Sequence, residues 1–174
     1  MAEQTDAVDR IVAQWARERP DLDSSPMAVI GRLHRVAALL EEELRPVFAE
    51  AGLGNGDFDV LASLRRAGAP YRLTPSDLIA STMVTSGAVT KRVDRLVARG
   101  LVTRSVSAED GRGRLVELTP AGLRLTAELV GRHWANEDRL LGPLAPAERQ
   151  ALAGLLRTLL VDLEGSDAGP VDAG

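Results

Sequence analysis

The sequence predicts a mainly α-helical protein with a small β-hairpin wing, arranged as a winged helix-turn-helix with long N- and C-terminal dimerisation helices. Two observations predict this fold class. Most of the chain carries apolar residues at helical spacing, and a helix, a tight turn and a second helix directly precede two short runs of β type. With 174 residues the chain is long enough for one compact domain with extensions.

Two helices are expected before the helix-turn-helix. Residues 1–20 contain an extra N-terminal helix whose apolar residues, Trp15 among them, recur at helical spacing. A second helix over 26–52 begins where Ser25 can cap it and Pro26 suits its first turn, and it ends at Gly52. Because this helix is long for a domain of this size, we expect much of its apolar face to pack on another long element.

The winged helix-turn-helix DNA-binding region is expected over residues 57–118, and within it the hydrophobic period changes from helical to alternating after Gly100. Its expected elements are a helix capped by Asp57 that ends at Gly68, a short helix starting at Thr74 and Pro75, a helix from Ser86 to Arg99, and strands over 101–106 and 114–118. The remaining dimerisation helices are expected over 120–164, and the Gly-, Asp- and Ala-rich tail over 165–174 is expected to be disordered.

Taken over the whole chain, the net charge of −4 argues against nucleic-acid binding. This value is an average that hides a large difference between segments. Residues 61–116 carry ten basic and four acidic side chains, a net +6, and the rest of the chain carries eleven basic and twenty-one acidic ones, a net −10. A positive segment confined to the helix-turn-helix and wing is typical of a surface that binds phosphates.

The helix from Ser86 to Arg99 separates two roles by its geometry. At 100° per residue, Val89, Val93 and Leu96 form a stripe that we expect to be buried. The residues expected to face a major groove, on the opposite side or at its edges, are Gly87, Thr90, Lys91, Asp94 and Arg95, with small Thr85 and Ser86 allowing close approach of the backbone.

Arg92 lies beside the buried stripe, about 60° from Val89. It is therefore placed to reach inward to a carboxylate or a ligand, and the alternative is that it contacts a phosphate or solvent. Between the strands, Arg112 and Arg114 stand near a flexible turn, and weakly hydrated guanidinium groups suit a narrow minor groove. The alternative there is a solvated basic turn.

The composition excludes several classes of function. The chain has no cysteine and only two histidines, His34 and His133, which argues against thiol chemistry and a metal site, and we expect no cofactor. It has no phosphate-binding loop and no nucleophile elbow, so we expect no enzyme. It also has no apolar run long enough for a membrane span and no secretory signal, which predicts a cytoplasmic protein.

Three stretches resemble the MarR family of bacterial transcriptional regulators, and with the flanking helices the resemblance covers nearly the whole chain. They are Leu73-Thr-Pro-Ser-Asp-Leu-Ile79, Val84-Thr-Ser-Gly-Ala-Val-Thr-Lys-Arg-Val-Asp-Arg-Leu-Val-Ala-Arg-Gly-Leu101 and Asp110-Gly-Arg-Gly-Arg-Leu-Val-Glu-Leu-Thr-Pro-Ala-Gly122. The resemblance implies a homodimer on a pseudo-palindromic operator in double-stranded DNA. It also implies a wing whose Asp110 and Arg112 touch the minor groove.

A finer resemblance is to the urate-responsive branch of that family, typified by PecS, HucR and TamR. It rests on Trp15 in the extra helix, Asp59 in the helix before the reading head and Arg92 in the recognition helix. It implies a ligand site at these residues for a small anion of the urate, aconitate or citrate, or aromatic carboxylate class. Ala67 stands where the urate pattern has Asn, which argues against urate itself.

Other interpretations of these residues stay open. Trp15 can be a core residue, Asp59 can favour a helix N-terminus, and His34 can pack in its helix or line the ligand pocket. The main prediction is a ligand-responsive DNA-binding repressor. The alternative is a constitutive DNA-architectural or interaction module that has no ligand.

Overall fold

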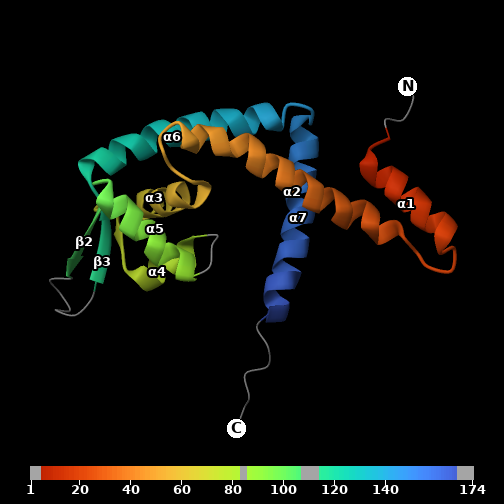
Figure 1. Ribbon diagram of the computed structural model, residues 1–174, viewed down its shortest axis with the longest axis horizontal. Coiled ribbons are helices and arrows are strands. Elements are labelled where there is room, and N and C mark those ends of the chain that lie inside the picture. Colours follow the sequence, from red (N-terminus) through yellow and green to blue (C-terminus); the bar gives the residue numbers. More distant parts are fainter. Residues whose placement is uncertain (1–4, 83–85, 107–113, 168–174) are drawn as a thin grey trace, which may run out of the picture. The chain divides into compact units, whose positions relative to one another are not determined.

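The computed structural model describes residues 5–82, 86–106 and 114–167. It forms two compact units, residues 1–133 and residues 134–174, which are described separately (Figure 1). The helices are α1 (Ala7–Glu18), α2 (Ser25–Ala49), α3 (Asn55–Arg66), α4 (Pro75–Ser81), α5 (Ser86–Ala98), α6 (Pro120–Leu140) and α7 (Pro146–Asp167), and the strands are β1 (Arg72–Leu73), β2 (Val102–Val106) and β3 (Arg114–Leu118). The mainly helical fold class with a β wing is confirmed.

The sheet has three antiparallel strands in the order β1-β3-β2. The two expected strands pair from Val102 opposite Leu118 to Val106 opposite Arg114. The third strand was not expected, because β1 is only two residues long and shows no alternation; it pairs Leu73 with Val116. β1 therefore ties the chain just before α4 to the base of the wing.

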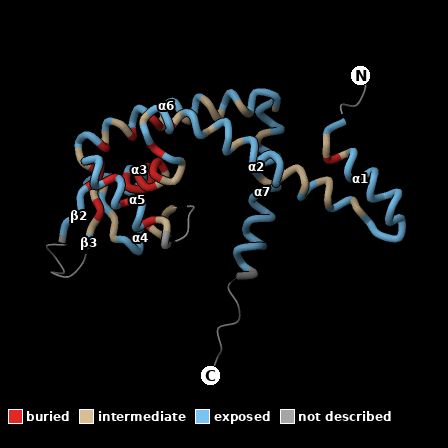
Figure 2. The backbone as a smooth tube through the Cα atoms, in the orientation of Figure 1, coloured by how far each residue is buried: buried red, intermediate tan, exposed pale blue. Residues whose placement is uncertain are grey.

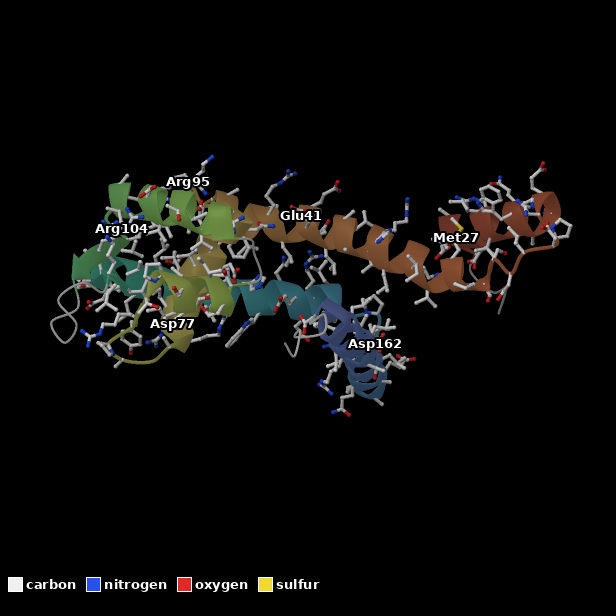
Figure 3. The ribbon with its side chains drawn as sticks, turned by 90° about the horizontal axis from the view of Figure 1, so that it is seen from below. Met27, Glu41, Asp77, Arg95, Arg104 and Asp162 are labelled. Atoms are coloured by element: carbon white, nitrogen blue, oxygen red, sulfur yellow. The ribbon has the colours of Figure 1, made fainter. Side chains whose placement is uncertain are left out.

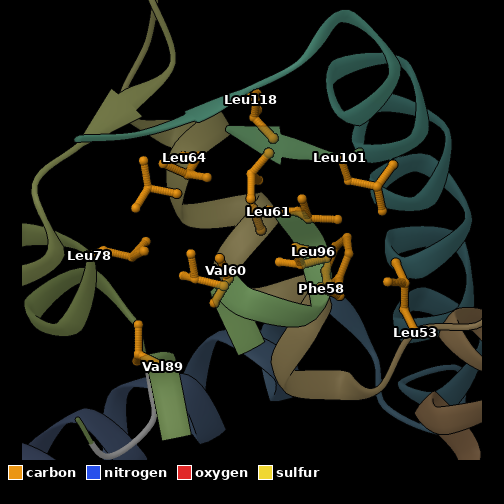
Figure 4. Close-up of a cluster of buried hydrophobic side chains, with 14 of the residues drawn as sticks. Leu53, Phe58, Val60, Leu61, Leu64, Leu78, Val89, Leu96, Leu101 and Leu118 are labelled. Atoms are coloured by element: carbon orange, nitrogen blue, oxygen red, sulfur yellow. The ribbon is translucent and has the colours of Figure 1, made fainter. Parts of the chain in front are cut away.

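The core of the first unit is built around α3, α5 and the sheet (Figures 2 and 4). Val60, Leu61 and Leu64 of α3 have no exposed surface, which makes α3 the central helix of this unit. The predicted stripe of α5 is confirmed, with Val89, Val93 and Leu96 at 3%, 3% and 0% exposure. One face of α5 is thus fixed in the core, and this determines which residues its other face presents.

Two predicted helix caps are wrong by one or more positions. Ser25 is the first residue of α2, and its N–H donates to the carboxylate of Asp23 at 2.9 Å. Asp57 is the third residue of α3, where its Oδ2 accepts the N–H of Gly54, the true N-cap, at 3.1 Å. Where several cap-forming residues follow one another, spacing alone does not choose among them.

Helix α1 packs on the N-terminal part of α2. A Cβ at Gly31 would lie 3.2 Å from Val8, the one buried residue of α1, so the two backbones approach closely there. Arg32 of α2 pairs with Asp6 at 2.9 Å and with Asp9 at 2.6 Å. These contacts attach the extra helix to the long one.

The second unit contains the end of α6 and all of α7. Arg149 pairs with Asp138 across the turn between the two helices. Helix α7 continues through Asp167, so the expected disordered tail is wrong for residues 165–167, and the rest of that prediction lies outside the described residues. Its apolar side chains are largely exposed, Leu155 at 67% and Leu163 at 65%.

In the described part of the chain, no helix combines the length and apolar character that a bilayer crossing requires.

Candidate DNA interface and ligand site

Helix α5 presents a polar face away from the core. Thr90, Lys91, Asp94 and Arg95 are exposed, as the helical geometry predicted. Thr85 lies outside the described residues, and the structure describes only the backbone at Ser86 and Gly87. The exposed face is suited to base edges and phosphates, because it combines a small hydroxyl with cationic groups.

The wing is connected to α5 by an ion pair. Arg104 of β2 donates to Asp94 of α5 at 2.6 Å, and both side chains are about half exposed. Arg114 begins β3 and is exposed, whereas Asp110 and Arg112 lie outside the described residues. The base of the wing therefore places Arg104 beside α5, the helix that also carries Arg95 (both labelled in Figure 3).

A cavity of about 330 Å³ lies between α4, α5 and the wing. Its lining is mostly apolar and also includes Thr90, Asp94, Arg104 and Arg114. Sequence reasoning did not find this cavity, because its walls come from three elements that meet only in the folded chain.

Arg92 turns toward α3, the helix that carries half-buried Asp59. A Cβ at Gly56 would lie 2.0 Å from the Cζ of Arg92, so the guanidinium rests directly on the first turn of α3. Among the described residues, the buried Arg92 Nη1 and Asn55 Oδ1 have no hydrogen-bond partner. A donor and an acceptor are thus both buried at the start of α3.

The structure of one chain does not bring Trp15 together with Arg92. Trp15 is half exposed on α1, which packs near Gly31, whereas Phe48 at the other end of α2 belongs to the core that contains α5. Gly31 and Phe48 are 17 positions apart, about 25 Å of helix. His34 is exposed on α2 between them.

Sequence reasoning missed the role of Asp57. Its Oδ1 accepts a hydrogen bond from Arg95 at 2.6 Å, and the residue is only 7% exposed. Arg99 donates to the carbonyl oxygens of Gly52 and Ala51, each at 2.7 Å. The sequence held one indication of a role for Asp57, its position just before the apolar stripe of a helix. This position suggested a helix cap, but it did not indicate the ion pair with Arg95.

The described residues contain no group of three or more acidic or histidine side chains that could hold a metal ion.

Comparison with known proteins identifies the family. Residues 51–113 match the model of the MarR family. The chain is 41% identical over 149 residues to the HTH-type transcriptional regulator PecS of Dickeya dadantii, covering 86% of this chain and 90% of PecS. This confirms both the expected family and the expected branch.

Solved structures agree with the fold. BpsR of Bordetella bronchiseptica, whose DNA binding is regulated by 6-hydroxynicotinic acid, aligns with a TM-score of 0.68 at 30% identity over 75% of this chain and 91% of that one. A MarR mutant from E. coli complexed with operator DNA aligns with a TM-score of 0.66 at 31% identity over 80% and 99% of the two chains. These relatives are regulators of transcription rather than enzymes. The chain therefore belongs to the MarR family of winged helix-turn-helix transcriptional regulators.

Proposed function

We propose that this protein is a ligand-responsive repressor that binds a pseudo-palindromic operator as a homodimer and leaves it when a small anion binds. The observation that carries the DNA-binding part is the two-sided helix α5. Val89, Val93 and Leu96 fix one side in the core, so the other side, with Thr90 and Lys91, is presented at a constant angle. A recognition helix needs this arrangement to enter a major groove in register.

The proposed DNA contacts divide between the grooves. Helix α5 and the residues before it supply the major-groove set, which is Thr85, Ser86, Gly87, Thr90, Lys91 and Arg95. The wing supplies Arg112 and Arg114 to the minor groove. Arg95 is paired with Asp57 in the single chain, so it must leave that partner to contact DNA.

The homodimer is supported by apolar surface that a single chain leaves exposed. On α2 this surface includes Val29, Ile30, Val36 and Leu39, each about half exposed, and on α7 it includes most of the leucines. Contiguous apolar surface of this kind usually marks an interface. Residues 26–52 and 120–164 are accordingly proposed as the dimerisation helices, residues 1–20 as an extra N-terminal helix, and residues 57–118 as the DNA-binding part.

The ligand is proposed to bind at Arg92 and Asp59. The buried Arg92 Nη1 and Asn55 Oδ1 offer a donor and an acceptor, which suits an anion that carries a polar ring or hydroxyl group. The regulation of BpsR by 6-hydroxynicotinic acid supports an aromatic carboxylate, and aconitate, citrate and urate are the other candidates. Trp15 on α1 and His34 on α2 lie far from Arg92 of the same chain. We therefore assign these two residues to the ligand site that contains Arg92 of the other copy in the dimer.

The release mechanism follows from the position of Arg92. It belongs to the recognition helix and also rests on the first turn of α3. An anion that binds Arg92 more tightly in a shifted position of α5 would move the population of dimers away from the DNA-binding geometry. The shift is limited by the difference between the anion's affinities for the two positions.

The first prediction concerns Arg92→Ala. We expect this variant to bind DNA but to need at least tenfold more anion for release, because the coupling residue is missing. The measurement is fluorescence anisotropy of an operator selected in vitro, titrated with 6-hydroxynicotinate, citrate, aconitate and urate.

Arg124→Ala is the matched control, since Arg124 is exposed on α6, and it should respond as the wild type does. Release of Arg92→Ala at wild-type concentrations would show that Arg92 does not couple ligand to DNA. If no anion releases the wild-type protein or shifts its Tm, the constitutive DNA-architectural module becomes the better description.

A further inference from the structure

Two arginines of α5 and the arginine directly after it are turned toward the protein. Arg92, Arg95 and Arg99 are spaced by three and four residues, so they share one side of the helix. All three contact residues 51–57, which comprise most of the connection from α2 and the first turn of α3. Arg92 rests on Gly56, Arg95 pairs with Asp57, and Arg99 donates to two carbonyl oxygens. Much of the positive charge of the recognition helix is therefore engaged within the chain.

The pair of Arg95 with Asp57 differs from the other two contacts because it neutralises charge. The Asp57 side chain is 10% exposed, and its two oxygens have different partners, Arg95 at 2.6 Å and the N–H of Gly54 at 3.1 Å. Its position in the first turn of α3 also favours a negative charge. The carboxylate would thus keep a hydrogen bond and a favourable helix end if Arg95 left.

Arg95 is able to leave. Its side chain is 56% exposed, and it lies one turn beyond Lys91 on the helix that faces DNA. A phosphate oxygen forms the same charge-assisted hydrogen bond with a guanidinium as a carboxylate does. Carboxylate and phosphate are therefore alternative partners for one cation.

We propose that Asp57 competes with DNA phosphates for Arg95 and thereby weakens the sequence-independent binding of DNA. This inference rests on the DNA-binding part of the proposed function and is independent of any ligand. Sequence-independent affinity depends on how many phosphates are neutralised. Removing one cation from that count lowers the affinity for all sequences by a similar factor, so Asp57 limits how tightly the protein is held on unrelated DNA.

The test is Asp57→Asn in the full-length protein, bound to a 30-base-pair duplex of random sequence between 50 and 200 mM salt. The amide oxygen can still accept the Gly54 N–H, but the negative charge is gone. We expect the slope of log K against log salt to steepen by about 0.9, so that affinity falls about 3.5-fold more across this range than for the wild type.

Two controls make the result specific. Glu128→Gln removes the same charge from an exposed pair with Arg132 on α6 and should leave the slope unchanged. In an Arg95→Ala background, adding Asp57→Asn should also leave the slope unchanged, since the released cation is absent.

The outcomes separate this inference from the function on which it rests. A wild-type protein that binds neither this duplex nor an operator selected in vitro overturns both. A wild-type protein that binds while Asp57→Asn has the slope of Glu128→Gln, or binds more weakly, overturns the competition alone. A steeper slope that persists without Arg95 overturns it as well.

Discussion

Two helical glycines lie against very different neighbours. A Cβ at Gly56 would lie 2.0 Å from the Cζ of Arg92, the far end of a long side chain that can move away. A Cβ at Gly122 would lie 2.0 Å from the carbonyl oxygen of Leu101, which belongs to the backbone between α5 and β2. The same methyl group therefore has a mobile neighbour in one case and a fixed neighbour in the other.

The second prediction follows from this difference. We expect Gly122→Ala to lower the free energy of unfolding by about 1–3 kcal/mol, because the backbone must move to admit the methyl group. We expect Gly56→Ala to change it by less than about 1 kcal/mol, since a better helix former offsets the movement of Arg92. Urea denaturation measures both values.

Gly131→Ala is the control, on the same helix as Gly122 but with nothing within 4 Å of an added Cβ. It should stabilise the protein by about 0.5–1 kcal/mol through helix propensity alone. Equal effects at positions 122 and 131 would show that the close approach to Leu101 is absent in solution.

The sequence shows which residues are basic, but it does not show which acidic side chains pair with them. The count of +6 over residues 61–116 treated Arg95 as a free cation, because Asp57 lies just outside that segment. Helical geometry correctly separated the buried stripe of α5 from its exposed face, since that depends only on the period of 3.6. Partners contributed by α3 depend on how two helices pack, which one helix cannot reveal.

At the scale of elements, the attachment of α1 to α2 depends on charge. The backbone N–H of Asp9 and the Arg32 guanidinium lower the pKa of Asp6 below its usual range. A hydrogen bond from Arg32 lowers the pKa of Asp9 likewise. A carboxyl whose pKa is lowered by folding stabilises the folded form, and the stabilisation is complete at a pH above the carboxyl's pKa in the unfolded chain, about 3.9. This stabilisation is lost as the pH falls through the lower pKa that the carboxyl has in the folded protein.

The third prediction is that α1 separates from α2 in acid before the core unfolds. In a Trp134→Phe variant, Trp15 is the single tryptophan, and its acrylamide quenching should rise as the pH falls below about 4. Adding Arg32→Met should move this transition to higher pH, because the carboxyls return toward their ordinary pKa. Identical profiles with and without Arg32 would contradict the role of these pairs.

Element positions were easier to predict than element ends. Long apolar periods identified the helices, whereas β1 and the last turn of α7 have no pattern of their own. β1 exists because β3 offers it a partner, and two residues cannot show alternation. The approach of Gly56 to Arg92 was likewise unpredictable, because it depends on the crossing of α3 and α5.

For the whole molecule, the charge distribution and the exposed apolar faces give a consistent description. The net −10 outside residues 61–116 is divided between residues 1–60, with six basic and twelve acidic side chains, and residues 117–174, with five basic and nine acidic ones. Repulsion of those segments by DNA would favour approach through the reading head, an effect that salt weakens. The apolar side chains of α7 lie within these acidic segments, so they are suited to another copy of the chain and not to DNA.

The fourth prediction tests that assignment through Leu159→Glu. Leu159 lies at the centre of the leucine stripe of α7 and is 42% exposed in the single chain, so a glutamate there costs the monomer little but places a charge in the dimer interface. We expect light scattering to show a monomer. Two linked reading heads bind two half-sites jointly, so its affinity for a selected operator should fall at least about 100-fold.

Gln150→Glu adds the same charge on the other side of α7 and should remain dimeric, because Gln150 lies about 180° from the leucine stripe. A Leu159→Glu protein that stays dimeric would place the interface on another surface. If it becomes monomeric and still binds the operator as tightly as the wild type, one reading head is sufficient, and the pseudo-palindromic operator is wrong. The two measurements thus test the dimer and its use on DNA separately, since mass reports the first and affinity the second.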